Sequence, residues 1–347
     1  GGDRMAAAGL RSLFPIAELS VMGLVEVIPH IRRIAQRMAQ TVDAAADFAP
    51  DLIVTIDAPG FSLRLTKRLR ARLGPDPRIV HYVVPTVWAW KPKRAAKMAA
   101  LYDAVLCLLP FEPPYFEREG LPAVFVGHPA AADGAAAPRD AARDRLGLPA
   151  DRPILLVALG SRKGELRRLA PIFADATLRL RNEFPDLLCL FPTVETVVDV
   201  ARAQAAAWPV EARVFATPDE RALSMAAADA AIAASGTVGL ELAAAGTPHL
   251  IAYRLAPLTF AIAKRLVKAR FAHLANILAD QALINERIQD ACTADAVAEQ
   301  ARALLRGESW PAEAVAEQIA KLAAAPGGVT PAAAAARAAL TSRARAT

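Results

Sequence analysis

Residues 227–248 read AADAAIAASGTVGLELAAAGTP, an apolar strand that reaches a polar corner at Ser235-Gly236-Thr237 and continues as an apolar helix. A strand that turns sharply into a helix is the repeating unit of α/β proteins. The first N–H groups of such a helix have no partner inside it, and the positive end of the helix dipole lies behind them. The corner therefore suits a phosphate or diphosphate group.

Glu241 adds a second feature to the corner. It follows Thr237 by four residues, so it lies one turn into the helix on roughly the same face. A carboxylate there can accept both hydroxyls of a ribose, which indicates a nucleoside diphosphate site. An ordinary helix N-cap, with an acidic residue near the positive end of the dipole, is the alternative that this stretch leaves open.

The composition indicates a folded protein of about two domains. The chain has 347 residues, of which 54% are hydrophobic and 22% charged. Its net charge of +6 suits anionic ligands or an anionic membrane surface but is small for a nucleic-acid binder. No basic stretch alternates with aromatic residues, as single-strand binding requires. We therefore expect no nucleic-acid partner.

Metal binding and membrane spanning are not indicated either. Cys107, Cys189 and Cys292 are far apart and lack CxxC spacing, as in proteins of reducing compartments. The five histidines form no HExxH pattern. No apolar stretch approaches the ~18 uncharged residues of a membrane-spanning helix. The chain opens with Gly1-Gly2, and we expect no signal peptide.

Strand-like and helix-like runs alternate along the chain, which predicts an α/β protein with parallel sheets. The expected strands are residues 51–56, 78–84, 104–109, 124–126, 154–159, 187–191, 213–215, 230–234 and 249–253; the expected helices are 64–73, 91–100 and one from 165 onward. Residues 130–153 are the expected linker. We expect two Rossmann-like domains facing a cleft, residues 1–150 and 151–326. Residues 327–347 are an Ala/Arg-rich, low-complexity tail, expected to be frayed or disordered.

Two polar residues follow expected strands, where ligands gather in open α/β sheets. Asp57 ends an apolar strand, and partial desolvation there favours a general base; a structural Asp that caps the next helix is the alternative. Arg162 follows Gly160-Ser161 at the end of another strand. Its planar guanidinium matches phosphate oxygens, whereas an exposed ion pair is the alternative.

Aromatic and histidine residues provide further candidates. Trp88 and Trp90 lie two apart, so an extended segment would place both on one face. Core packing is the ordinary role of such a pair, and a sugar or acyl platform is the functional one. His128 lies between glycine and proline, where it can bond to the backbone or face the cleft.

Residues 258–271 (LTFAIAKRLVKARF) combine apolar residues with Lys264, Arg265 and Lys268. Basic amphipathic helices of this kind can lie at membrane interfaces, and solvated surface helices are the commoner alternative.

Taken in order, nine blocks resemble the lipid-A-disaccharide synthases, a family 19 glycosyltransferase group of the GT-B fold. The blocks are LSVMGLVEVIPHIRR (19–33), IDAPGF (56–61), HYVVPTVWAWKPKR (81–94), LLPFEPPYF (108–116), VGHP (126–129), GSRKGEL (160–166), ASGTVGLELA (234–243), YRLAPLTFAIAKRLVK (253–268) and HLANILAD (273–280). The similarity runs from residue 1 to about 306. A lone SGT corner is weak, but this ordered set is highly specific.

The resemblance implies an inverting transfer of 2,3-diacylglucosamine from UDP to the 6-hydroxyl of 2,3-diacylglucosamine 1-phosphate (lipid X), which gives the β-1,6 disaccharide of lipid A and releases UDP. It implies no metal and no cofactor, because helix N-termini and basic side chains can stabilise the leaving diphosphate. It also implies a peripheral enzyme on the cytoplasmic face of the bacterial inner membrane, in contact with anionic lipid. A homodimer is a further candidate partner.

The same resemblance assigns roles to individual residues. It implies that Asp57 is the essential aspartate and Arg162 the GSR arginine. The UDP-binding set that it implies is Gly160, Ser161, Arg162, Ser235, Gly236, Thr237, Glu241 and Asn276. Trp88, Trp90, His128, Lys264, Arg265 and Lys268 are candidates for acceptor or membrane contact.

The chain departs from the family pattern at three places. Leu159 and Ala275 stand where the family usually has proline before GSR and before Asn276. The family's first strand and its glycine-rich GExSGD loop, which borders the acceptor side, do not precede Gly1. A chain without them exposes apolar sheet edges, so we expect this segment alone to be poorly active or inactive.

Other functions also fit two Rossmann-like domains. One alternative is another GT-B UDP-sugar transferase or an epimerase. The other is a non-catalytic protein that binds nucleotide sugars or lipids.

Overall fold

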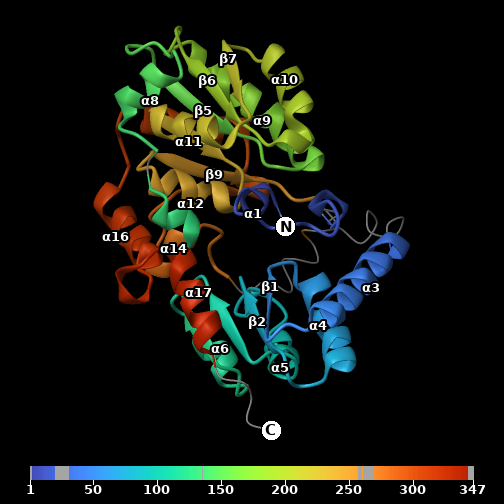
Figure 1. Cartoon of the computed structure of the whole chain (residues 1–347). Coiled ribbons are helices and arrows are strands. Elements are labelled where there is room, and N and C mark those ends of the chain that lie inside the picture. Colours follow the sequence, from blue (N-terminus) through green and yellow to red (C-terminus); the bar gives the residue numbers. More distant parts are fainter. Residues whose placement is uncertain (1, 20–30, 135, 257–259, 261–268, 343–347) are drawn as a thin grey trace.

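Two parallel β-sheets form the framework of the chain (Figure 1). The computed structural model describes residues 2–19, 31–134, 136–256, 260 and 269–342. The first sheet has the strand order β1-β2-β3-β4, and the second has the order β10-β9-β8-β5-β6-β7. Every pair of neighbouring strands is parallel. The expected α/β class with two Rossmann-like sheets is confirmed.

The first sheet and its helices come from the N-terminal part of the chain. The elements are α1 (Asp3–Ala7), η1 (Ile16–Leu19), α3 (Ile31–Phe48), β1 (Leu52–Ile56), α4 (Pro59–Leu73), β2 (Arg78–Tyr82), α5 (Arg94–Ala99), β3 (Ala104–Cys107), α6 (Pro113–Glu117) and β4 (Ala123–Phe125).

Helices α3, α4, α5 and α6 cover one face of this sheet. They meet β2 and β3 at residues such as Ile79 and Val105, while Val80 and Leu106 point to the opposite face. This alternation follows from the two-residue period of a strand. Among the described strands β1 forms one edge, where the side chains of Val54 and Ile56 are 42% and 44% exposed.

The chain then crosses to the second sheet. Its elements are α7 (Pro129–Ala132), α8 (Arg139–Arg145), β5 (Ile154–Ala158), α9 (Lys163–Arg181), β6 (Leu188–Pro192), η3 (Glu195–Val197), α10 (Val198–Ala206), β7 (Ala212–Phe215), α11 (Pro218–Ala227), β8 (Ala230–Ala233), α12 (Thr237–Ala244), β9 (His249–Tyr253), α14 (Leu274–Ala279), β10 (Glu286–Ile288), η4 (Gln289–Ala291), α15 (Ala294–Leu305) and α16 (Ala312–Ala323).

The second sheet is buried on both faces. Leu155 and Val157 of β5 pack with α9 and α15, whereas Leu156 and Ala158 pack with α11 and α12. Burial on both faces explains why its strands are continuous apolar runs rather than alternating ones. The expected linker, 130–153, contains α7 and α8, and their Ala131 and Ala142 pack into this second core. The domain limits 1–150 and 151–326 stay predictions.

The expectation of a frayed tail is wrong for residues 331–341. After η5 (Pro326–Gly328), helix α17 (Pro331–Thr341) returns to the first sheet and covers the face that α3–α6 leave open (Figure 1). Ala335 and Ala339 are buried against Val80 and Leu106. Alanines are small and form helices readily, so a low-complexity Ala-rich segment can still pack closely on a sheet.

The expected strands all form, with ends shifted by at most two residues. Helix α4 begins at Pro59 rather than at residue 64, because proline fits the first turn of a helix, where no N–H partner is needed. Within the described part of the chain, no helix is both long enough and apolar enough to cross a membrane.

Candidate active site

The order of strands in the second sheet places two loops side by side. The chain leaves β5 toward β6 on one side and returns to β8 on the other, so β5 and β8 flank the point where the strand order reverses. Ligands of open α/β sheets bind at this point, beyond the carboxyl ends of the strands. Ala158 is paired with Ala233, and Ala234 donates its N–H to the carbonyl of Ala158 at 2.9 Å. The loops 160–162 and 235–237 therefore leave the sheet as neighbours.

The Ser235-Gly236-Thr237 corner is a strand-to-helix turn, as expected. Gly236 is the N-cap residue of α12, with φ 134° and ψ −160°, a conformation that L side chains rarely adopt. Because glycine has no side chain, the helix is not closed by a capping hydroxyl at that position. Gly236 and Thr237 are exposed and Ser235 is half-buried. The N-terminus of α12 therefore faces solvent at the reversal point, which favours the anion-site interpretation over an ordinary side-chain cap.

Glu241 is half-buried in α12, one turn after Thr237. The helix lies close to its neighbours at Gly239, where an added Cβ would stand 2.9 Å from Cδ2 of His273. His273 contacts His249 at 3.2 Å between the Nε2 atoms, and burial lowers the pKa of both rings, that of His249 to about 3. Both imidazoles are therefore neutral at physiological pH, and this packing fixes the position of α12.

The loop after β5 is held by a carboxylate that sequence reasoning did not single out. Glu165 accepts the N–H of Ser161 at 3.1 Å, Nη1 of Arg162 at 3.2 Å and the hydroxyl of Tyr253 at 2.8 Å. The side chain of Glu165 is 9% exposed and that of Arg162 is 55% exposed. The guanidinium therefore has one contact with Glu165 and a large surface open to solvent. Glu165 is the third residue of α9, a position where acidic residues commonly reach back to the loop, and that signal could have identified it.

The backbone at the carboxyl ends of β1 and β2 has unusual φ values. Asp57 and Ala58 have φ values of 47° and 45°, and Val83, directly after β2, has φ 66°. Positive φ is strained for residues with a Cβ, most of all for a β-branched one. Asp57 donates its N–H to Tyr82 at 2.9 Å, and its carbonyl accepts the hydroxyl of Ser62 at 2.6 Å. Strained residues of this kind concentrate at functional sites.

The expected desolvation of Asp57 is not found, because its side chain is exposed. The apolar residues before it belong to β1, an edge strand among those described, and Ile56, directly before Asp57, is exposed as well. The helix-cap alternative is not found either, since the N-cap residue of α4 is Ala58. The Asp57 carboxylate is therefore in contact with solvent. Its backbone is strained and is held by hydrogen bonds.

Trp88 and Trp90 lie in a turn, not in an extended segment. Ala89 and Trp90 both donate N–H groups to the carbonyl of Thr86, so the expected alternation along a strand does not apply. Trp88 is half-buried and donates Nε1–H to Glu112 at 3.2 Å, while Lys91 lies 5.0 Å above the Trp90 ring. Burial raises the pKa of the Glu112 carboxyl to about 7. Trp88 is thus tied to the core through Glu112, and Trp90, which is also half-buried, contacts Lys91.

His128 and Asn276 are buried rather than open to the site. The backbone N–H of His128 donates to Leu322 at 2.7 Å, and its Nδ1 atom has no hydrogen-bond partner among the described residues. Burial lowers the pKa of this imidazole. The amide of Asn276 is fully buried and bonds to the backbone of Ile284 and to the Glu286 carboxylate, all at 2.8–2.9 Å. Asn276 therefore fixes α14 against β10.

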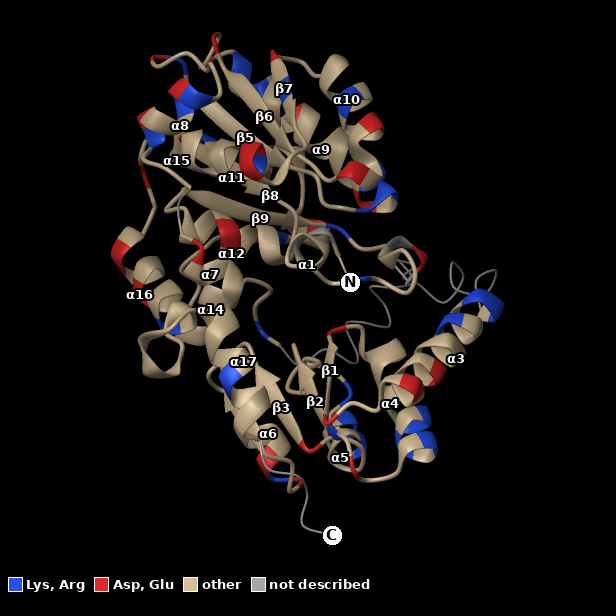
Figure 2. Cartoon of the chain, viewed as in Figure 1, with Lys and Arg blue, Asp and Glu red and all other residues tan. Residues whose placement is uncertain are grey.

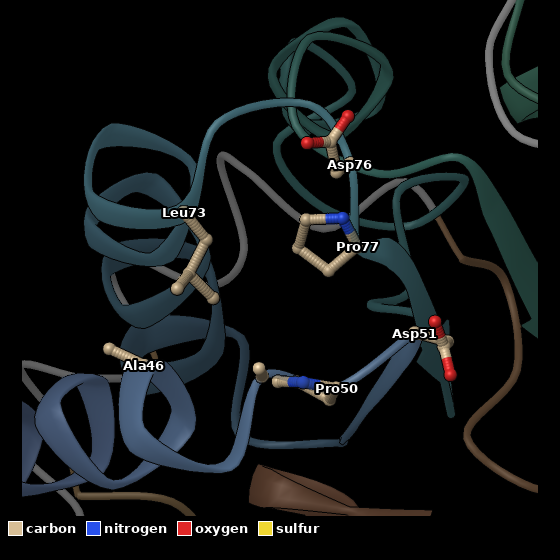
Figure 3. Close-up of a pocket in the computed structure, with 7 residues that line it drawn as sticks. Ala46, Pro50, Asp51, Leu73, Asp76 and Pro77 are labelled. Carbon is tan, nitrogen blue, oxygen red and sulfur yellow. The ribbon is translucent and has the colours of Figure 1, made fainter.

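Two further features complete the comparison with the expected site. Lys264, Arg265 and Lys268 lie outside the described residues. A pocket lined by Ala46, Pro50, Asp51, Leu73, Asp76 and Pro77 lies at the amino end of β1 and β2 (Figure 3). That is the opposite end of β1 from Asp57, and the pocket contains none of the expected site residues.

Two Rossmann-like domains with parallel sheets define the GT-B class of fold. A putative UDP-N-acetylglucosamine 2-epimerase from Listeria monocytogenes has the same fold, with a TM-score of 0.59 at 15% identity over 89% of this chain and 77% of that one. The lipid-A-disaccharide synthetase family model matches residues 1–330. The lipid-A-disaccharide synthases of Ruegeria pomeroyi and Rhodospirillum centenum are 47% and 44% identical to this chain over 86% of its length, and the matches cover 76% and 74% of those proteins. The chain belongs to the lipid-A-disaccharide synthetase family.

Membership makes the chain a hexosyltransferase of lipid A disaccharide synthesis. The likeness to epimerases is one of fold at low identity, so it does not favour the epimerase alternative. The lipid-A-disaccharide synthase of Paramagnetospirillum magneticum is 45% identical, with 80% of that protein covered.

Proposed function

We propose that the loops 160–162 and 235–237 hold the diphosphate of UDP-2,3-diacylglucosamine, and that Asp57 activates the 6-hydroxyl of lipid X. The observation that carries the donor site is the adjacency of these loops at the reversal point between β5 and β8. They present a guanidinium and an open helix N-terminus, two groups that attract phosphate for different reasons.

The proposed reaction is an in-line displacement at the anomeric carbon. Asp57 removes the proton from the acceptor hydroxyl as its oxygen bonds to that carbon, and the bond to the UDP oxygen breaks on the opposite side, which inverts the centre. Arg162 and the N-terminus of α12 stabilise the negative charge that develops on the departing diphosphate. Groups already oriented toward developing charge lower the barrier without reorganising.

Glu241 provides the test of the nucleotide assignment. Hydrogen bonds to a charged acceptor are worth about 1.5–3 kcal/mol, so each ribose hydroxyl bound by this carboxylate contributes roughly tenfold or more in affinity. We expect the protein to bind UDP at least about tenfold more tightly than 2′-deoxy-UDP, and Glu241→Ala to lose that preference, measured by calorimetry.

A matched control is Glu313→Ala, which removes an exposed carboxylate from the first turn of α16. It should keep the full preference for UDP. Equal preference for UDP in Glu241→Ala and in the unmodified protein would mean that Glu241 does not bind the ribose.

We also propose that the chain binds anionic lipid on the cytoplasmic face of the inner membrane. Helix α4 has basic residues and no acidic ones, and those exposed are Arg64, Lys67, Arg68 and Arg72 (Figure 2). Lys91, Lys93 and Lys97 continue the same charge at α5, and α4 and α5 pack into one core on the same face of the sheet. Each basic residue close to an anionic surface adds about 1 kcal/mol to binding.

Replacing the four exposed α4 residues with glutamine should reduce flotation with anionic liposomes by at least about tenfold. The control replaces four exposed basic residues of the second domain and of α16: Arg181, Arg202, Arg306 and Lys321. A second variant neutralises Lys264, Arg265 and Lys268. Unchanged flotation in both the α4 and the 264–268 variants would refute membrane binding through these residues.

A homodimer is part of the same proposal. Sedimentation equilibrium of the purified chain tests it, and a single monomer mass at all concentrations would refute it.

A further inference from the structure

We propose that Glu165 is a positioning residue, which holds the 160–162 loop and the Arg162 guanidinium in the arrangement that receives the donor diphosphate. The inference rests on the proposed UDP site and adds to it a residue that makes no contact with substrate. Tyr253, at the end of β9, is its partner and fixes the orientation of the carboxylate.

The contacts of Glu165 show how one side chain sets the loop. Its Oε2 atom accepts the backbone N–H of Ser161, and its Oε1 atom accepts Nη1 of Arg162. One carboxylate thus fixes both the backbone before Arg162 and the direction of the arginine side chain. With 9% of its side chain exposed, Glu165 is screened little by water, so these charge-assisted bonds are stronger than surface ones.

The loop and the carboxylate are matched in shape as well. Gly160 has φ 96°, and an added Cβ there would stand 2.5 Å from Oε2 of Glu165. Any larger residue would displace the carboxylate from its place against the loop. The glycine of this loop therefore makes room for Glu165, in addition to allowing the turn itself.

Tyr253 connects the loop to the rest of the sheet. Burial, and then the bond to Glu165, raises the pKa of its phenol to about 12, so the hydroxyl stays protonated and donates. A second bond runs in parallel, from Nε of Arg168 on α9 to the carbonyl of Arg254 at 3.1 Å. These two bonds connect the start of α9 to the end of β9. Strand β8 lies between β9 and β5, and the 235–237 corner directly follows β8.

The sign of the effect on UDP affinity distinguishes this inference from a simpler one, in which Glu165 only stabilises the dipole of α9. A carboxylate beside a diphosphate site repels the ligand, so a Glu165 that only favoured the α9 dipole would hinder UDP binding, and its neutralisation would leave affinity unchanged or improve it. A positioning role predicts the opposite sign. Neutralisation would release the loop and the arginine, and UDP affinity would fall.

The experiment measures UDP and uridine binding by calorimetry and competition for Glu165→Gln, Tyr253→Phe and the double variant. We expect Glu165→Gln to weaken UDP about tenfold or more, Tyr253→Phe to weaken it less, and the double variant to match Glu165→Gln, because both changes act through one carboxylate. Uridine affinity should stay the same in all three, since uridine has no phosphate for the loop to hold.

Glu220→Gln is the matched control, because Glu220 is the third residue of α11 and completes its capping box. It should leave the affinity for UDP unchanged. Unchanged or tighter UDP binding in Glu165→Gln, or an equal loss for uridine, overturns the inference. If Glu165→Gln does not fold, Tyr253→Phe decides on the same criteria. Arg162→Ala separates the two proposals: if it does not weaken UDP, the proposed site itself is wrong.

Discussion

Asp57→Asn is expected to lower kcat by about a thousandfold and to leave the affinity for UDP within about twofold. Asparagine keeps the size of the side chain but cannot accept the proton of the acceptor hydroxyl. The exposed position of Asp57 leaves the carboxylate accessible to an incoming hydroxyl. The measurement is disaccharide formation from labelled UDP-diacylglucosamine and lipid X by the protein with the family's first strand and GExSGD loop restored before Gly1, combined with calorimetry for UDP.

The control is Asp51→Asn, an exposed aspartate directly before β1, at the opposite end of the strand (Figure 3). It should retain full activity. A loss of UDP affinity parallel to the loss of turnover in Asp57→Asn would show that Asp57 supports the structure of the site. Retained activity would remove Asp57 from the reaction.

The backbone around Asp57 supports a functional role independently of its side chain. Asp57, Ala58 and Val83 occupy positive φ at the carboxyl ends of two adjacent strands. Residues in such conformations cost of order 1–3 kcal/mol each, so the surrounding contacts must hold them. The bonds from Asp57 to Tyr82 and from Ser62 to Asp57 are two of these contacts. The strain therefore lies where the acceptor hydroxyl would be activated.

The fold was largely predictable because each strand has a recognisable local sequence pattern. Runs such as ILLVA at β5 are apolar, short and followed by glycine or proline, and buried parallel strands have this pattern. The alanine-rich helix α17 was not predictable in this way. Its place is decided by apolar residues of the first sheet more than 200 positions earlier in the chain, such as Val80 and Leu106.

The site residues also differ in how far the sequence could predict them. The corner at Gly236 could be predicted, since a strand, a glycine and a helix follow one another in sequence. The roles of Glu165 and Tyr253 could not, because their contact joins residues 88 positions apart and depends on the strand order. The exposure of Asp57 was not predicted either, because the apolar run before it indicates burial, whereas β1 is an edge strand of the described sheet.

Arg162→Ala is expected to weaken UDP binding by about 10- to 150-fold, the loss of one charge-assisted contact to phosphate at about 1.5–3 kcal/mol. The side chain is 55% exposed and has one bond to Glu165, so the affected binding surface is its solvent-facing side. Uridine binding should not change. Arg162→Lys should recover only part of the affinity, because an ammonium cannot make the paired contact of a planar guanidinium.

Arg167→Ala, an exposed arginine one turn further along α9, is the control and should bind UDP normally. Salt adds a second criterion: UDP binding should weaken with ionic strength less in Arg162→Ala than in the unmodified protein, because one fewer cation faces the phosphates. An equal salt dependence and an affinity within about twofold would mean that Arg162 does not hold the diphosphate and that the proposed site is wrong. If UDP binding does weaken, the loss of kcat in Arg162→Ala shows whether the arginine contributes further in the transition state, where the charge on the leaving UDP is largest.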